Sequence, residues 1–331
     1  MVGQTTGPLV SAIVANWNGA VDLEVLLPSL TSQSYPFLEI IVVDNGSSDE
    51  SEQVAKRHGA RWHPLGANLG LAGALNAGAR VANGEFLLFL NNDMRLHSEF
   101  VRELLLPLVF DDLLFATDAK QFDWKGEKVV HQCTVLSSIS IHGPIFVQLD
   151  TSHSSFCVVG SAANLMVRRW MFEALGGWDT RYPIGWEDVD LCWRAWLRGW
   201  PTLYVPSAVC WHRVGASASS LEGAKRRLEG TLKGRLLFAT MHLPASWALK
   251  VVAATMAGVL CDLARGKAAM TAIRLQALRW YVMLLPRVLL ERHALYRSAG
   301  SSPDVHFVRL KNVALLPYDG GIKRSPESAY E

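Results

Sequence analysis

The feature that most constrains the fold is the apolar run Phe86–Leu90, which ends in Asn91-Asn92-Asp93. Five apolar residues are too few to cross a membrane and too uniform for a half-exposed strand, but they are typical of a strand buried on both faces of a parallel sheet. In open α/β sheets, ligands bind beyond the carboxyl ends of the strands. Asp93 is therefore expected where a metal or a phosphate is bound. The same polar residues could instead only turn the chain and cap a helix that begins near Ser98.

The residues before this run alternate between strand-like and helix-like patterns. This alternation over the first hundred residues predicts an α/β fold, a parallel sheet with helices on both faces and right-handed crossovers. The predicted strands are 9–15, 40–43, 61–65 and 86–90, and the predicted helices are 21–32, a short one ending at Gly59, and 71–82. No G-x-G-x-x-G follows the first strand and no G-x-x-x-x-G-K-[ST] occurs, which argues against a dinucleotide-binding or P-loop protein.

Beyond residue 112 the pattern loosens into short strand-like runs, which we interpret as strands and loops that meet a second substrate. Order returns near residue 158, and Gly185-Trp186 then precede Glu187, Asp188 and Asp190 at the start of a predicted helix. The helix dipole tolerates acids there, but it does not explain the Gly-Trp-Glu-Asp sequence. We therefore expect Glu187 or Asp188 to be functional, whereas Asp190 could simply pair with Arg194 one turn later.

The charge is distributed unevenly along the chain. Residues 1–221 carry 15 Lys and Arg against 22 Asp and Glu, whereas residues 222–300 carry 13 against 4. We therefore divide the chain into an α/β domain at 1–221 (halves of about 1–112 and 113–221), an amphipathic helical segment at 222–300 and a loosely ordered tail at 301–331.

The helical segment is apolar as well as basic. Arg279, Arg287 and Arg292 rim its apolar stretches, as is typical of helices that lie in a lipid headgroup layer. The alternative is a helical cap or a dimer interface with solvated cations. A true span is not expected, because the most apolar window, Trp247–Leu263, contains Lys250 and Asp262. Nucleic acid is disfavoured as a partner because the basic residues do not lie among base-stacking aromatics.

The five cysteines are scattered and form no C-x-x-C pair, which predicts neither a disulfide framework nor a zinc site and fits a reducing cytoplasm. Met1–Pro8 has neither a basic region nor an apolar core, so we expect no signal peptide.

Taken in order, several short motifs between residues 9 and 217 resemble the inverting family 2 glycosyltransferases of GT-A fold. That fold is a Rossmann-like, mixed but mainly parallel sheet with helices on both faces. The motifs are Ile13–Asn18, Val42–Asp49, Asn68-Leu69-Gly70, Asn76-Ala77-Gly78, Leu90–Asp93, Gly176–Asp179, Glu187–Leu191 and His212–Ser217.

The resemblance implies a nucleotide-diphosphate sugar donor and a role for each matching residue. Asp44 would hydrogen-bond the nucleobase, and Asp93 would bind Mg²⁺ or Mn²⁺ with His212, a residue that by itself is more often structural. Asp188 would deprotonate the acceptor hydroxyl, with Glu187 as the weaker candidate. The other residues expected to contact the nucleotide sugar are Asn16, Asn18, Asn68, Gly70, Asn76 and Asn92.

This chain departs from the family at Asn91-Asn92-Asp93, where many relatives have Asp-x-Asp, so the requirement for metal is left open. Within the family it looks most like bacterial rhamnosyltransferase-type enzymes acting on polyprenyl-diphosphate-linked sugars in cell-wall or surface-polysaccharide synthesis. That resemblance implies a peripheral protein on the cytoplasmic face of the membrane, with an anionic lipid surface as partner. The alternatives are a family 2 transferase with a soluble acceptor and a dimerising tail, and a non-catalytic nucleotide-sugar-binding scaffold.

Overall fold

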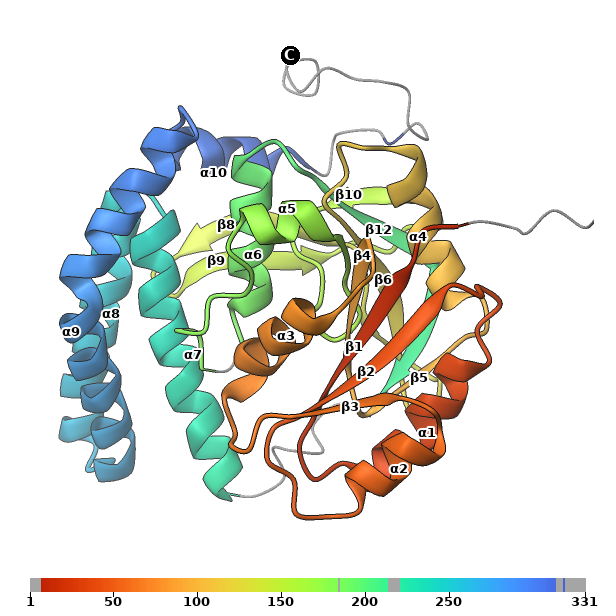
Figure 1. Ribbon diagram of the computed structural model, residues 1–331. Helices are drawn as coiled ribbons and strands as arrows, with labels where there is room; N and C mark the ends of the chain where they lie inside the picture. Colours follow the sequence, from red (N-terminus) through yellow and green to blue (C-terminus); the bar gives the residue numbers. More distant parts are fainter. Residues whose placement is uncertain (1–6, 184, 214–220, 314–317, 319–331) are drawn as a thin grey trace, which may run out of the picture.

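The computed structural model describes residues 7–183, 185–213, 221–313 and 318. A twisted ten-stranded sheet occupies the centre and carries helices on both faces, while the C-terminal helices form an outer wall along one side (Figure 1). The strand order is β10-β12-β6-β11-β4-β1-β2-β3, with β5 added beside β12 and β7 beside β6. This is the mixed, mainly parallel α/β architecture that the sequence predicts.

Four strands of the first hundred residues form the parallel part of the sheet, as predicted. They are β1 (Val10–Asn16), β2 (Leu38–Asp44), β3 (Arg61–Pro64) and β4 (Phe86–Asn91). The helices between and after them are α1 (Ala20–Thr31), α2 (Ser51–Arg57), α3 (Gly70–Val81) and α4 (Phe100–Phe110). Every residue from Phe86 to Leu90 is buried, because the helices cover both faces of β4.

Alternate residues of β4 belong to two separate cores. Phe86, Leu88 and Leu90 pack with apolar residues of α1, α2 and α4. Leu87 and Phe89 face the opposite way and pack with α3 and two later helices, α5 (Arg169–Ala174) and α6 (Glu187–Leu197). This period of two, buried on both sides, is the physical reason for the unbroken apolar run.

The second half of the sheet mixes strand directions. The short β11 (Met166–Arg168) runs antiparallel between β4 and β6 (Ala116–Asp123), and β12 (Thr202–His212) runs parallel to β6. The predicted runs at 203–205 and 208–211 are one strand with an irregularity between Val205 and Val209. The three-residue β5 (Met94–Leu96) pairs antiparallel with the end of β12, so that His212 lies opposite Met94.

The stretch in which the pattern loosens consists of strands, as predicted. It contains β7 (Val129–His131), the separate hairpin of β8 (Thr134–Ser140) and β9 (Gly143–Gln148), and β10 (Ser155–Cys157).

The C-terminal segment folds into α7 (Leu221–His242), α8 (Ala245–Ala264), α9 (Ala268–Ser298) and α10 (Pro303–Lys311). Helix α7 packs on the α/β domain, where its Leu237 and Phe238 are buried with Trp193 and Trp196 of α6. Helices α8 and α9 form the outermost layer (Figure 1). Among the described residues, α8 alone is long and apolar enough to cross a membrane, and only 28% of its most apolar window is buried in the protein.

Two sequence expectations for this segment need correction. The tail 301–331 is not uniformly loose, because α10 forms within it: Pro303 occupies the first turn and the Ser302 hydroxyl accepts the Val305 N–H. Residues 319–331 of that tail lie outside the described chain. Arg292 does not rim an apolar outer face, since its guanidinium donates to the carbonyls of Thr240 and Leu243 at the end of α7.

Candidate functional site

The β4–β5 turn and the end of β12 bring two predicted metal ligands together. Asp93 Oδ1 lies 3.1 Å from His212 Nε2, and both side chains are mostly buried. His212 Nδ1 lies 3.1 Å from Gln121 Oε1 on β6. Because an amide oxygen only accepts, this contact keeps the hydrogen on Nδ1 and turns Nε2 toward Asp93. Metal-bound histidines are commonly oriented by such a second partner.

The pair provides two ligands of the kinds that Mg²⁺ and Mn²⁺ accept, one carboxylate and one imidazole. No cluster of three or more His, Cys, Asp or Glu suited to a metal is present in the described part of the chain. Asn91 replaces the carboxylate of many relatives, and its Nδ2 lies 3.5 Å from His212 Nε2. A six-coordinate ion held here would take most of its ligands from water or from a bound diphosphate, so the residues fit a metal that is shared with a substrate.

The predicted donor residues meet at the carboxyl ends of β1, β2 and β4. The Asn16 Oδ1 on β1 accepts from Asn92 Nδ2 at 2.8 Å, and the Asp44 carboxylate on β2 accepts the Ser47 N–H at 3.0 Å. Asn18 has a left-handed backbone (φ +49°), and its Oδ1 accepts the Ser48 N–H at 2.8 Å. Asn16 and Asn92 thus hold each other, and Ser47 and Ser48 hold Asp44 and Asn18, at the strand ends where an α/β sheet binds its ligand.

The loop before α3 is tied to the same edge of the sheet. Asn68 Oδ1 accepts the N–H of Gly70, which has φ +75°, a conformation that glycine adopts without strain. Asn45, which the sequence analysis did not single out, bridges this loop to β2: its Oδ1 accepts the Leu69 N–H and its Nδ2 donates to the Gly70 carbonyl. The position of Asn45 directly after Asp44, at the end of a predicted strand, is the sequence feature that could have indicated this role.

Asn76 has a different environment from the other predicted donor residues. Its Nδ2 donates to the Trp178 carbonyl at 2.8 Å and its Oδ1 accepts the Trp178 N–H at 3.0 Å. Both polar atoms of this amide therefore hold the Gly-Gly-Trp-Asp turn against α3. Binding of the nucleotide sugar by Asn76 stays a prediction.

The Glu187–Asp188 pair begins α6 after a strained residue. Trp186 is the N-cap and has φ +76°, which is costly for a bulky side chain. Its indole packs on Phe238 of α7, with ring centroids 5.1 Å apart. A Cβ at Gly234 of α7 would lie 2.7 Å from the Trp186 ring, so glycine makes room for it. Helix α7 thereby fixes the orientation of the two acids.

The two adjacent carboxyl groups differ in environment. Glu187 is buried, and its Oε2 has no hydrogen-bond partner among the residues that the structure describes. Burial, and then the neighbouring Asp188, raise the pKa of Glu187 to about 8, which favours its protonated form. Burial also raises the pKa of Asp188, against the N–H groups of Val189 and Ala162 and the charge of His131, which lower it. Asp188 is half-buried and is the member of the pair that accepts these N–H groups.

Asp190 forms the predicted pair with Arg194, with Oδ2 2.7 Å from Nε. Its Oδ1 lies 2.8 Å from Nε2 of the fully buried His242 on α7, and the Tyr182 hydroxyl donates to it at 3.3 Å. Burial alone would raise the pKa of Asp190, but Arg194 and His242 hold it far below its usual range. This acid is structural. No sequence pattern pointed to His242, which lies 52 residues away.

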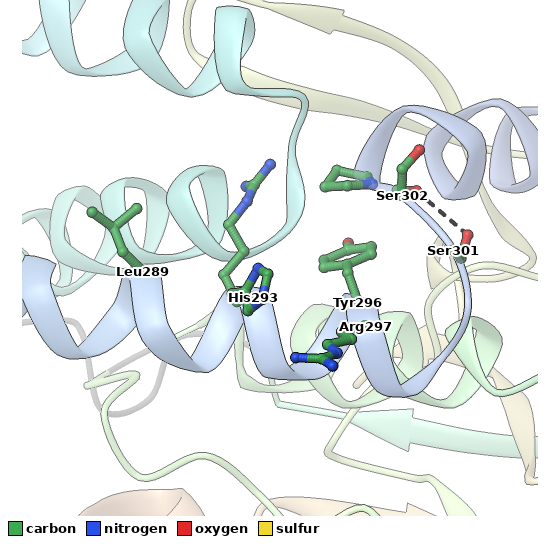
Figure 2. Close-up of a pocket in the computed structure, with 8 residues that line it drawn as sticks. Leu289, His293, Tyr296, Arg297, Ser301 and Ser302 are labelled. Atoms are coloured by element: carbon green, nitrogen blue, oxygen red, sulfur yellow. Dashed lines mark hydrogen bonds between the residues drawn. The ribbon is translucent and has the colours of Figure 1, made fainter.

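A cavity of about 430 Å³ lies at the junction of α9 and α10 (Figure 2). Its lining includes His293, Tyr296 and Arg297 of α9 and Ser302 before α10. None of the predicted site residues lines this cavity, so it is separate from the candidate site.

Comparisons with known proteins agree with the fold. The model of the Glycosyl transferase family 2 matches residues 11–159. The poly-beta-1,6-N-acetyl-D-glucosamine synthase of Staphylococcus epidermidis is 24% identical over 216 residues, which cover 64% of this chain and 52% of the synthase. The chain spans about half the length of the first curated relatives that it matches.

Solved structures with the same fold are similar over most of the chain. The mannosyltransferase PcManGT from Pyrobaculum calidifontis, solved with GDP-Man and Mn²⁺, has a TM-score of 0.55 at 18% identity and covers 85% of this chain and 87% of its own. GalNAc-T7, solved with UDP, GalNAc and Mn²⁺, has a TM-score of 0.58 at 18% identity. The match covers 73% of this chain and 49% of the GalNAc-T7 chain. The chain therefore has the GT-A fold of these structures, and its residues 11–159 are similar to the glycosyl transferase family 2.

Proposed function

We propose that this protein is an inverting glycosyltransferase that moves a sugar from a nucleoside diphosphate sugar to a hydroxyl of a glycan acceptor. The observation that carries the proposal is the Asp93–His212 pair, held at the carboxyl edge of the sheet by the pairing of β5 with β12. The relatives named as glycosyltransferases, and the structures solved with UDP or GDP-Man and Mn²⁺, support a nucleotide-sugar donor and a divalent ion.

Asp93 and His212 would hold the Mg²⁺ or Mn²⁺ ion, whose chemistry is to neutralise charge on the departing diphosphate. Asp44, Asn16 and Asn18 would orient the nucleoside part of the donor at the adjacent strand ends. Asn92, hydrogen-bonded to Asn16, would keep the β4 end in register with that pocket. Rigid strands that carry these groups favour a single donor geometry.

The bond changes of an inverting transfer require one base. The acceptor oxygen forms a bond to the anomeric carbon on one face, while the bond from that carbon to the diphosphate oxygen breaks on the other. The diphosphate keeps the electron pair, and the acceptor proton passes to the carboxylate of Asp188. Burial and the neighbouring Asp188 raise the pKa of Glu187 and favour its protonated form, whereas the backbone N–H groups and the His131 charge around Asp188 favour its ionised form, which supports Asp188 for this role.

The outer face of α8 supports a membrane-bound acceptor. Leu249, Met256, Leu260 and Leu263 lie on one side of this helix and are 56–70% exposed. Lys250 and Arg265, near the two ends of the helix, and Arg279 on α9 are exposed as well. An apolar stripe flanked by cations is complementary to an anionic lipid surface. Asp262 is buried and ion-paired with Arg274 of α9 at 2.8 Å, which favours a helix that lies on the bilayer over one that crosses it.

The acceptor that this placement favours is a polyprenyl-diphosphate-linked glycan at the cytoplasmic face of the membrane. Synthesis of a cell-wall or surface polysaccharide agrees with the poly-beta-1,6-N-acetyl-D-glucosamine synthase relative. Rhamnose is the sugar that we propose to test first. This choice rests on the resemblance of Asn91-Asn92-Asp93, of the stretch His212–Ser217 and of the C-terminal segment to rhamnosyltransferase-type enzymes; residues 214–217 lie outside the described residues.

Calorimetric titration of UDP, dTDP, GDP and CDP with Mg²⁺, with Mn²⁺ or with EDTA tests the donor site. We expect one nucleotide to bind tightly, with binding lost in EDTA and in Asp93→Asn. His58→Gln, at an exposed pair with Glu24, is the control that should bind as the wild type does. Metal-independent binding would show that the diphosphate is held without the ion, and absence of binding by any nucleotide would contradict the proposal.

Sedimentation with lipid vesicles tests the membrane surface. We expect the protein to bind vesicles that contain anionic lipid and to lose this binding in Leu260→Glu, whereas Val308→Glu, at an exposed apolar position of α10, should still bind. If Leu260→Glu leaves vesicle binding intact but dissociates a dimer, the face is a subunit interface and the acceptor need not be lipid-linked.

A further inference from the structure

Near Asp188 lies an ion pair for which the proposed reaction gives no role. Asp118 of β6 is fully buried, and its Oδ2 lies 2.7 Å from Nε2 of His131 on β7. Its other carboxylate oxygen accepts the Ser161 N–H at 3.0 Å. Burying an ionised carboxylate costs free energy even when it accepts a backbone hydrogen bond, unless a partner carries the opposite charge.

The same loop connects this pair to the proposed base. Ser161 donates to Asp118, and the next residue, Ala162, donates its N–H to Asp188. Gly160 allows the loop to approach, since a Cβ there would lie 3.1 Å from the Asp118 Cβ and 2.5 Å from Leu165. Two consecutive amides of one loop therefore contact the two carboxylates, and the charges of both carboxylates act on His131.

We propose that His131, ion-paired to the buried Asp118, is a positioning residue that keeps the Asp188 carboxylate ionised and ready to accept the acceptor proton. This inference rests on the proposed function. It adds to the proposed site an Asp118–His131 pair that acts on the base Asp188. This pair comes from β6 and β7, not from the helix that carries Asp188.

The charges around His131 explain why such a group is needed. Burial lowers the pKa of the imidazole, but Asp118, and then Asp188, outweigh burial and raise it above its usual value. These are the titratable groups that face His131, Asp118 from β6 and Asp188 from α6. Burial next to Glu187 would otherwise favour the protonated form of Asp188, and the His131 charge opposes this.

The direct test is the pH profile of kcat/KM in His131→Gln, which keeps a hydrogen-bond donor for Asp118 but removes the charge. We expect the acidic limb of the profile to move up by about one pH unit, so that activity falls roughly tenfold at the low-pH end and much less at the high-pH end. Binding of the nucleotide should not change. His58→Gln is the matched control and should keep the wild-type profile. An equal loss at every pH, or an unshifted limb, would overturn the proposal.

A second measurement decides the matter if His131→Gln does not fold or if no turnover is found. The His131 imidazole is titrated by NMR in the wild type and in Asp188→Asn. We expect a lower His131 pKa in the variant, because one of its two facing carboxylates is gone. Equal values would contradict the proposed coupling. This readout needs no transfer activity, so it separates failure of this inference from failure of the proposed function.

Discussion

Two acids on the first turn of α6, Asp188 and Asp190, are two residues apart and have opposite electrostatic environments. Asp190 is enclosed by Arg194 and His242 and is kept ionised as part of the structure. Within the described part of the chain, Asp188 is stabilised by backbone N–H groups and by the charge of His131, and burial raises its pKa. The helix N-terminus favours both carboxylates equally. The partners supplied by other elements therefore decide which acid is structural and which is available for chemistry.

The largest effect is expected at the available acid. Asp188→Asn should lower the transfer rate by about a hundredfold to ten thousandfold, the range for loss of a general base, while nucleotide binding survives. Single-turnover kinetics and calorimetry measure the two quantities. If nucleotide binding is lost together with activity, Asp188 is structural as Asp190 is, and the contrast between the two acids disappears.

Asp190→Asn should instead destabilise the fold, because it leaves Arg194 buried without its counterion. Breaking a buried pair in this way costs about 3–5 kcal/mol, and denaturant unfolding followed by circular dichroism measures it. Surviving molecules should bind nucleotide normally. Asp49→Asn, at a carboxylate that accepts the Ala20 N–H on the donor side, is the comparison variant and should be milder. Equal losses in the free energy of unfolding in the two variants would mean that the network around Asp190 stabilises the fold no more than an ordinary surface hydrogen bond does.

Gly234→Ala tests whether α7 holds the start of α6 in place. The added methyl group would lie 2.7 Å from the Trp186 ring, and overpacking of this kind costs about 1–3 kcal/mol. We expect reduced transfer with unchanged nucleotide binding, since the donor residues lie elsewhere. Gly258→Ala, which meets only the flexible end of Arg274, is the control in α8. Wild-type activity in Gly234→Ala would show that Trp186 can move without consequence.

The smallest effect is expected for Glu187→Gln, which replaces a protonated acid by a neutral group of the same shape. Activity at pH 7 should change less than threefold, roughly the size of a minor packing effect. The folded-state pKa of about 8 lies above the ordinary 4.5, so the wild type loses stability as the pH rises from about 4.5 to 8. That loss should be absent in Glu187→Gln. A variant that unfolds with the wild-type pH dependence would show that Glu187 is not protonated in the folded state.

The fold was largely predictable because short, local sequence patterns identify the strands and helices of its first half. Continuous apolar runs identify β1, β2 and β4, and helical spacing identifies α1 and α3. Predicting these elements therefore requires no knowledge of contacts that are distant in sequence. The same logic placed Asp44 and Asp93 at strand ends. It failed for α10, which lies in a segment predicted to be loosely ordered: Pro303 is the first residue of this helix and the Ser302 side chain caps it.

The partners of the site residues were not predictable in the same way. Gln121, His131 and His242 touch their targets across 91, 13 and 52 residues, and in each case sheet order or helix packing creates the contact. No periodicity marks such residues, and a single histidine in an apolar context is more often structural than functional. The resemblance to a family supplied the roles of Asp188 and His212, but it did not supply the groups that set their charge.

The anchoring of α6 by later elements has a consequence for synthesis on the ribosome. The strands β1 to β4, which carry Asn16 and Asp44, are complete by residue 91, and His212, the second proposed metal ligand, follows at the end of β12. The contact of Asp190 with His242 can form only when residue 242 has emerged. His306 of α10 contacts the Trp193 carbonyl later still. The groups proposed to bind the donor are therefore all made before the last contacts that hold α6, and a nascent chain stalled in α9 could bind nucleotide without being active.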